Sequence, residues 1–102
     1  MSIPAGTTPT FVLTFEGVDL TEAAHIYATF RGGSGETITK ENDDLTITET
    51  TISVYLSQEE TLMLSRGSMD IQVNWTYPDG SRAASEIARY ALTRNLLPKV
   101  IA

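Results

Sequence analysis

Residues 57–92, SQEETLMLSRGSMDIQVNWTYPDGSRAASEIARYAL, decide the fold of this chain. Within this segment every second residue from Met69 to Tyr77 is apolar, and polar residues stand between them. Successive side chains of a β-strand point to opposite faces, so the alternation predicts a strand with one dry and one wet side. Pro78-Asp79-Gly80 then supplies a preset φ and a residue that tolerates positive φ, which predicts a tight turn.

The residues before this strand predict a short helix. Ser57 and Glu60 have the spacing of a capping box, in which the serine caps backbone amides and the glutamate reaches back. We expect one helix near 58–64 that ends before Gly67. Its apolar side would consist of Leu62, Met63 and Leu64.

The residues after the turn, 82–92, fit two structures. Ala84, Ile87, Ala88 and Ala91 have helical spacing. As a strand, the segment places Ala84, Glu86, Ala88, Tyr90 and Leu92 on one face, which is a less regular alternation. A tight turn directly after a strong strand favours a returning hairpin strand, so we expect a strand and keep the helix as the alternative.

The remaining chain predicts more short strands, separated by turns. Alternating or β-branched residues indicate strands near 11–15, 25–31, 36–40, 45–48 and 51–56. Residues 1–9 read as an extended N-terminal arm and residues 95–102 as an apolar C-terminal tail. We therefore expect an all-β fold in a single domain spanning 1–102. It would be an immunoglobulin-like antiparallel β-sandwich of about six or seven strands, with one short helix near 58–64.

Composition argues against several classes of partner. The net charge of the 102 residues is −6, which opposes binding to a phosphate backbone and to anionic lipid surfaces. No apolar run approaches the roughly 20 residues that cross a bilayer, and the first residues lack the features of a signal peptide. We expect a protein made in the cytoplasm without a signal peptide, with no nucleic-acid and no membrane partner.

The sequence carries no recognisable catalytic or metal-binding pattern. There is no cysteine, and the single histidine, His25, is expected on the outer face of a strand. Glu41, Asp43 and Asp44 could offer oxygen ligands to calcium, but they lack the spacing of a calcium loop and are expected in a solvated turn. We expect no enzyme activity, no cofactor and no small-molecule substrate.

Six residues are the candidate partner contacts. Tyr27 and Tyr55 each alternate with plainly apolar neighbours and are expected on outer faces, whereas the register of Trp75 and Tyr77 indicates core and rim. The tail residues Leu96, Leu97, Val100 and Ile101 either pack back on the sandwich or form an exposed apolar patch.

Three motifs, which lie between residues 3 and 87 of the chain, carry a family resemblance. They are IPAGTTPTFVLTF (3–15), LSQEETLML (56–64) and MDIQVNWTYPDGSRAASEI (69–87). With them the chain resembles small proteins encoded in the structural-gene modules of phages and prophages of Gram-positive bacteria. The order of elements is similar to that of the N-terminal domain of phage upper baseplate proteins, without their long receptor-binding extension.

The resemblance implies a virion structural protein of the tail or baseplate. Its partners would be other phage structural proteins and itself, and it would be made in the bacterial cytoplasm and incorporated in the virion. The alternatives are a small host- or glycan-binding β-sandwich module, or an assembly helper that is not retained in the particle. The loops at 32–35 and 41–44 are short and lack aromatic residues, which counts against a binding module.

Overall fold

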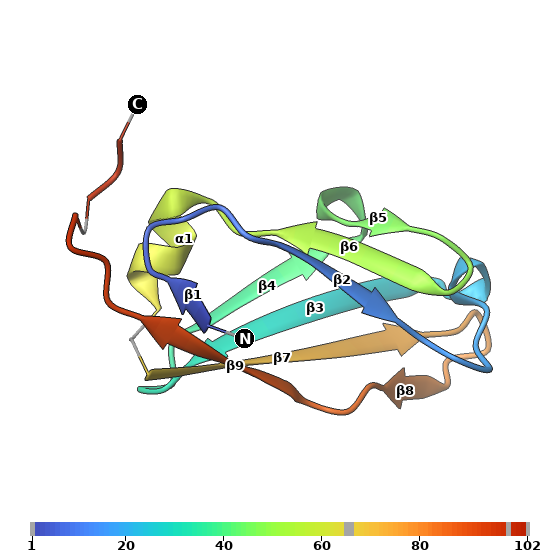
Figure 1. Ribbon diagram of the computed structural model, residues 1–102. Coiled ribbons are helices and arrows are strands. Elements are labelled where there is room, and N and C mark those ends of the chain that lie inside the picture. The colour runs from blue at the N-terminus through green and yellow to red at the C-terminus, as the bar shows by residue number, and fades with distance from the viewer. Residues whose placement is uncertain (1, 65–66, 98, 102) are drawn as a thin grey trace.

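Two β-sheets, A and B, face each other in the computed structural model, which describes residues 2–64, 67–97 and 99–101 (Figure 1). Sheet A has the order β1-β9-β7-β3-β4, with β8 also paired to β7, and sheet B has the order β2-β6-β5. The strands of sheet A are β1 (Ser2–Pro4), β3 (His25–Gly32), β4 (Thr37–Glu41), β7 (Gly67–Thr76), β8 (Arg82–Ala84) and β9 (Ala88–Thr93). Those of sheet B are β2 (Thr10–Thr14), β5 (Thr46–Ile47) and β6 (Thr51–Tyr55). The helices are η1 (Leu20–Glu22), η2 (Asn42–Asp44) and α1 (Gln58–Met63).

This architecture confirms the predicted all-β sandwich. In immunoglobulin-like domains strands C, F and G form one sheet while B, E and D belong to the other, and β3, β7, β9 and β2, β6, β5 reproduce that arrangement. Two details differ from the prediction. The described residues form nine strands rather than six or seven, because the N-terminal arm contributes one and residues 82–93 contribute two. In addition, the sandwich is not wholly antiparallel, since β1 and β9 run parallel.

The N-terminal arm is extended, as predicted, but it pairs within its own chain. Ile3 lies opposite Leu92 in the parallel β1–β9 ladder, and the amide of Ala5 donates to the carbonyl of Thr93 at 2.8 Å. Ile3 and Ala5 are both buried. Burial of these two side chains explains why the arm follows sheet A before the chain crosses to β2 in sheet B.

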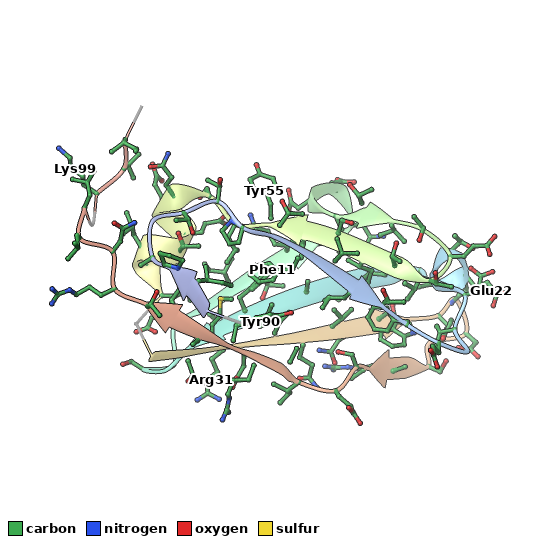
Figure 2. The ribbon with its side chains drawn as sticks, in the orientation of Figure 1. Phe11, Glu22, Arg31, Tyr55, Tyr90 and Lys99 are labelled. Atoms are coloured by element: carbon green, nitrogen blue, oxygen red, sulfur yellow. The ribbon has the colours of Figure 1, made fainter. Side chains whose placement is uncertain are left out.

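The core confirms the alternation that the sequence shows in the central strands. In the β3–β7 ladder Ile26 lies opposite Trp75, Ala28 opposite Val73 and Phe30 opposite Ile71, and all six side chains are buried. Sheet B contributes the buried residues Phe11, Ile52 and Val54, followed by Leu56. The ring of Phe11 lies 5.6 Å from that of Phe30 and 5.2 Å from that of Tyr90, so aromatic contacts join the two sheets (Figure 2).

The capping box at the start of α1 is confirmed. The hydroxyl of Ser57 accepts from the amide of Glu60 at 3.2 Å, and the carboxylate of Glu60 accepts from the amide of Ser57 at 2.9 Å. The predicted apolar side is partly wrong, because Leu64 is buried but Met63 is 53% exposed. The buried residue of the helix is Thr61.

A threonine rather than an apolar residue occupies this buried position because its hydroxyl bonds to the N-terminal arm. Its hydroxyl donates to the carbonyl of Thr7 at 2.8 Å and accepts from the amide of Gly6 at 2.9 Å. Gly6 has a φ of 82°, and a Cβ there would lie 3.3 Å from Cδ2 of Leu62. The close approach of the arm to α1 therefore requires both the glycine and the threonine.

Candidate functional site

The strand predicted over residues 82–92 is confirmed, but it is interrupted by a bulge. In the ladder with β7, Ala84 lies opposite Asn74 and Ala88 lies opposite Ile71. Four residue steps lead from Ala84 to Ala88, whereas three lead from Asn74 to Ile71, so one residue is inserted. Because of the inserted residue, odd-numbered residues face the core before the bulge and even-numbered residues face it afterwards. Ala83 packs against the core before the bulge, and Tyr90 and Leu92 face it afterwards.

Ser85 holds the bulge in place. Its amide donates to the carbonyl of Val73 at 2.8 Å, and its hydroxyl accepts from the amide of Val73 at 3.0 Å. The hydroxyl also donates to the carbonyl of Glu86 at 2.9 Å, and the side-chain amide of Gln72 donates to the carbonyl of Ser85 at 3.1 Å. These bonds replace the missing ladder bonds, so the bulge is a fixed part of the structure.

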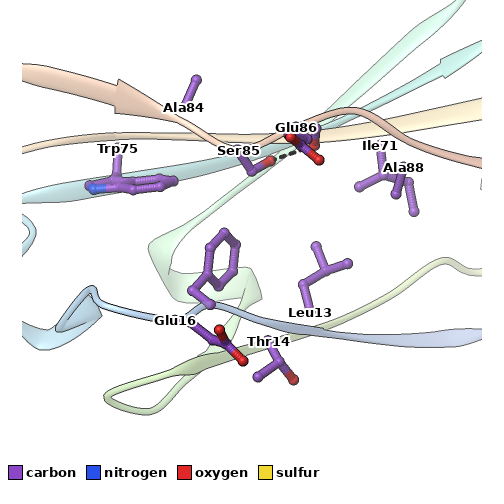
Figure 3. A pocket seen from close by; sticks show the side chains of 10 residues that line it. Leu13, Thr14, Glu16, Ile71, Trp75, Ala84, Ser85, Glu86 and Ala88 are labelled. Atoms are coloured by element: carbon purple, nitrogen blue, oxygen red, sulfur yellow. Dashed lines mark hydrogen bonds between the residues drawn. The ribbon is translucent and has the colours of Figure 1, made fainter.

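A groove of about 630 Å³ lies between β2 and this bulge (Figure 3). Its apolar lining includes Phe15 and Trp75, whose rings meet edge to face with centroids 5.5 Å apart. The exposed residues Glu16 and Glu86 also line it, one on each side. The other lining residues are Leu13, Thr14, Ile71, Ala84, Ser85 and Ala88. The groove thus combines an apolar floor with two carboxylates.

One wall of the groove is an edge strand. Among the described residues β2 pairs only with β6. The amide of Phe15 donates to Thr50 and the carbonyl of Pro9 accepts from Leu56, so backbone groups of the odd-numbered residues face β6. In an antiparallel strand the backbone groups of alternate residues point to opposite edges. The amides and carbonyls of Thr10, Val12 and Thr14 therefore face outward, beside the groove.

The tail residues predicted as partner contacts are exposed in this structure. Leu96 is 89% exposed, and Leu97, Val100 and Ile101 are 49%, 50% and 50% exposed. The tail projects from the end of the molecule at which β9 ends, and Lys99 points away from the body (Figures 1 and 2). Of the two alternatives for these four residues, the structure shows the exposed patch.

Among the described residues, few interactions tie the tail to the body. The side-chain amide of Gln58 on α1 donates to the carbonyl of Ile101 at 3.0 Å and accepts from its amide at 2.8 Å. Closer to β9, the side chain of Asn95 donates to the carbonyl of Ala5 at 2.9 Å. The two bonds to Ile101 are exposed and each contributes about 1 kcal/mol or less, so the end of the tail can exchange them for other partners.

The two candidate tyrosines lie on different sheets and do not form one site. Tyr55 on β6 is 57% exposed on the outer face of sheet B, and the Nζ atom of Lys40 lies 5.5 Å from the centroid of its ring. Tyr27 on β3 is half-buried on the outer face of sheet A. The exposed His25 stacks on it with centroids 6.3 Å apart, so this histidine lies on an outer face as predicted.

Lys40 also forms an ion pair that fixes α1 to β4. Its Nζ atom lies 2.7 Å from Oε2 of Glu60 and 2.9 Å from Oε1. Partial burial of Glu60 disfavours its charged form, but the hydrogen bonds from Lys40 and from the Ser57 amide outweigh that effect. The pKa of Glu60 is therefore below its ordinary value.

A second ion pair crosses from β7 to β9 beside the bulge. The guanidinium of Arg89 donates to both carboxylate oxygens of Asp70, at 2.8 and 3.2 Å. The hydrogen bond from Arg89 lowers the pKa of Asp70, and the same bond raises the pKa of Arg89. This exposed pair supports the register of the two strands on the outer face of sheet A.

The other sequence-based assignments have clear locations. Trp75 is buried and its indole N–H donates to the hydroxyl of the half-buried Tyr77 at 3.0 Å, which confirms their assignment to core and rim. Glu41, Asp43 and Asp44 lie at the end of β4 and in η2. Within residues 2–64, 67–97 and 99–101, no three histidine or acidic side chains gather as a possible metal site.

Comparison with protein-family models finds no match to this chain, and comparison with curated proteins finds none either. In the part of the chain that the structure describes, no helix is long and apolar enough to cross a membrane.

Sequence reasoning did not find the groove. Its residues lie on β2 and the two positions after it, on β7 and in the 84–88 segment, which the sequence does not bring together without the fold. One signal was present, because the alternation over residues 84–92 is irregular. A change in the parity of apolar residues within a strand indicates a bulge, and here the bulge forms one side of the groove.

Proposed function

We propose that this chain is a non-enzymatic structural protein of a phage particle, in the tail or baseplate, and that it acts by protein–protein assembly. The observation that carries the proposal is the projecting tail, whose four apolar side chains are about half or more exposed. Apolar residues concentrated on one exposed segment are typical of an interaction surface. The resemblance of the three sequence motifs to phage structural-module proteins supports the particle as the place of assembly.

The fold suits this role. The ladder between β3 and β7 spans eight residue pairs, and the aromatic contacts of Phe11 join the two sheets. A rigid sandwich with one projecting segment can take a defined position among symmetric neighbours, because the body fixes the orientation while the segment supplies the contact.

Mass spectrometry of purified particles tests the proposal. Particles induced from a source strain that carries the prophage should contain this protein at a constant ratio, near a small multiple of the subunits in a tail ring. If the protein is abundant in the lysate but missing from purified particles, the structural role is wrong. An assembly helper or a host-directed binding module would then replace it.

A further inference from the structure

The outer edge of β2 is the position at which immunoglobulin-like domains carry another strand. In that fold the strands named B, E and D share one sheet with the strand named A, which lies next to strand B. These letters name strands and are distinct from sheets A and B of this chain. Here β2 occupies the B position, and β1 pairs with β9 of the opposite sheet instead. Among the described residues, no strand pairs with the outward backbone groups of Thr10, Val12 and Thr14. The edge therefore offers hydrogen bonds to an added strand.

We propose that this edge and its groove receive the tail of a second copy of the chain, as an added strand beside β2. The proposal deepens the proposed function and rests on its view of the tail as the assembly segment. The tail offers exposed apolar side chains, and the groove offers an apolar floor formed by Leu13, Phe15, Ile71 and Trp75. Docking the tail on the groove removes the tail side chains and the accessible parts of Leu13 and Phe15 from water, above Ile71 and Trp75, which are already buried.

Charge identifies the tail as the occupant. The groove is lined by the exposed carboxylates of Glu16 and Glu86, in a chain whose net charge is −6. The segment 94–101 is cationic, because Arg94, just before the tail, and Lys99, within it, flank the first apolar pair and both are exposed. A basic apolar segment is thus complementary to an acidic apolar groove, and complementarity of this kind selects the partner and its orientation.

The alternation of a strand gives the docked arrangement. Phe11 and Leu13 of β2 have side chains that point into the core and backbone groups that face β6. A tail strand that bonds to the other edge places Leu96 and Val100 in the groove, while Leu97, Lys99 and Ile101 share the outer face with Glu16. The sequence has a proline between Leu97 and Lys99. In this arrangement its nitrogen faces away from β2, where an edge strand tolerates proline.

The contact is heterologous, because the tail of one copy meets the groove of another. Repetition of such a contact produces rings when the rotation closes and filaments when it does not. The tail leaves the molecule at the end of β9, whereas the groove begins at Ala88, where β9 starts, and extends toward Trp75. Each copy can therefore donate a tail and accept one.

Sedimentation of charge-reversed full-length chains tests the inference. Glu16→Lys with Glu86→Lys, or Arg94→Glu with Lys99→Glu, should each weaken self-association about tenfold or more at low ionic strength. An equimolar mixture of the two variants should associate again, because the unchanged tail of one meets the unchanged groove of the other. Asp43→Lys with Asp44→Lys, two exposed residues of η2 away from the groove, is the matched control and should associate as the parent does.

Cross-linking gives a second, independent readout, since the chain contains no cysteine. When the Thr14→Cys and Leu97→Cys chains are mixed and oxidised, they should form a disulfide-linked pair. Thr39→Cys, on the outer face of sheet A, is the control and should not form a disulfide with Leu97→Cys. A parent chain that remains monomeric at high concentration, or equal cross-linking at Thr14 and Thr39, would overturn the inference. Neither result touches the particle composition, so the proposed function is judged separately by mass spectrometry.

Discussion

The backbone amide of Val73 donates to the hydroxyl of Ser85 at 3.0 Å, where β8 gives way to β9. A side chain here performs the task of a backbone carbonyl, because the inserted residue shifts the next carbonyl out of reach. Val73 is fully buried in the central strand of sheet A, so its amide has no access to solvent. The hydroxyl of Ser85 therefore contributes two of the bonds that hold this wall of the groove.

Ser85→Ala should destabilise the protein and loosen the bulge. Leaving the Val73 amide without a partner costs about 1–3 kcal/mol in the free energy of unfolding. We expect hydrogen exchange of the Val73 amide to accelerate more than that of the β7 amides that face β3. Ser81→Ala, in the exposed turn before β8, is the control and should leave Val73 exchange unchanged. Unchanged protection of Val73 in Ser85→Ala would contradict this role for the hydroxyl.

Thr61→Val should detach the N-terminal arm from α1. Valine has nearly the shape of threonine, but it cannot donate to the Thr7 carbonyl or accept from the Gly6 amide. Because Thr61 is buried, the loss should lower the free energy of unfolding by about 1–3 kcal/mol. Thr61→Ser keeps the hydroxyl and should recover most of that loss in urea titrations. A Thr61→Val protein as stable as the parent would show that the hydrogen bonds of the hydroxyl do not hold the arm.

The ion pair of Lys40 and Glu60 should give stability that is lost in acid. The pKa of Glu60 is lower in the folded protein than its ordinary value of 4.5, so folding favours the ionised form. The contribution is then fully present above pH 4.5 and disappears as the pH falls through the lowered folded pKa. For this partly exposed pair we expect about 1 kcal/mol or less.

Urea titrations across this pH range check the expectation by comparing the parent with Glu60→Gln. The stability difference between the two should shrink as the pH falls below 4.5. Lys40→Met removes the ion-pair partner of Glu60. In that variant the stabilising contribution of the Glu60 charge should disappear at a higher pH than in the parent. A difference that stays constant into strong acid would show that the pair does not contribute through the charge of Glu60.

The predictable part of the fold depends on local patterns. The alternation from Met69 to Trp75 specifies the central strand by itself, and Ser57 and Glu60 specify the start of α1 through contacts three residues apart. Those elements were predicted correctly because the residues that determine them are neighbours in the sequence.

The features that were missed depend on distant contacts. Thr61 is buried because the arm, 54 residues earlier in the chain, presents the Thr7 carbonyl to it. β1 runs parallel to β9, and no local pattern specifies a partner almost 90 residues away. The groove likewise requires β2 to face residues 84–88, which only the packing of the two sheets brings about.

Deletion of residues 96–102 should leave a folded domain that no longer associates. Among the described residues, the hydrogen bonds that the deletion removes from the body are those between Gln58 and Ile101. Asn95, which bonds to Ala5, remains. We expect a loss of unfolding free energy of about 1 kcal/mol or less, together with a monomeric mass in sedimentation. A truncated chain that associates like the parent would exclude the tail as the assembly segment.

Two pairs of substitutions within the tail separate a docked strand from unspecific stickiness. Leu96→Asp with Val100→Asp places charges on the side that should enter the groove, whereas Leu97→Asp with Ile101→Asp places them on the outer side. All four residues are about half or more exposed in the single chain, so neither pair should change the free energy of unfolding by more than about 0.5 kcal/mol. Both pairs add the same charge and remove two apolar residues of similar size. We expect the first pair to weaken self-association about tenfold more than the second, because buried carboxylates without a cation in the apolar floor are strongly unfavourable. Sedimentation of the two variants at equal concentration measures the difference. If both pairs weaken association equally, the tail does not bind as a strand with one inward face.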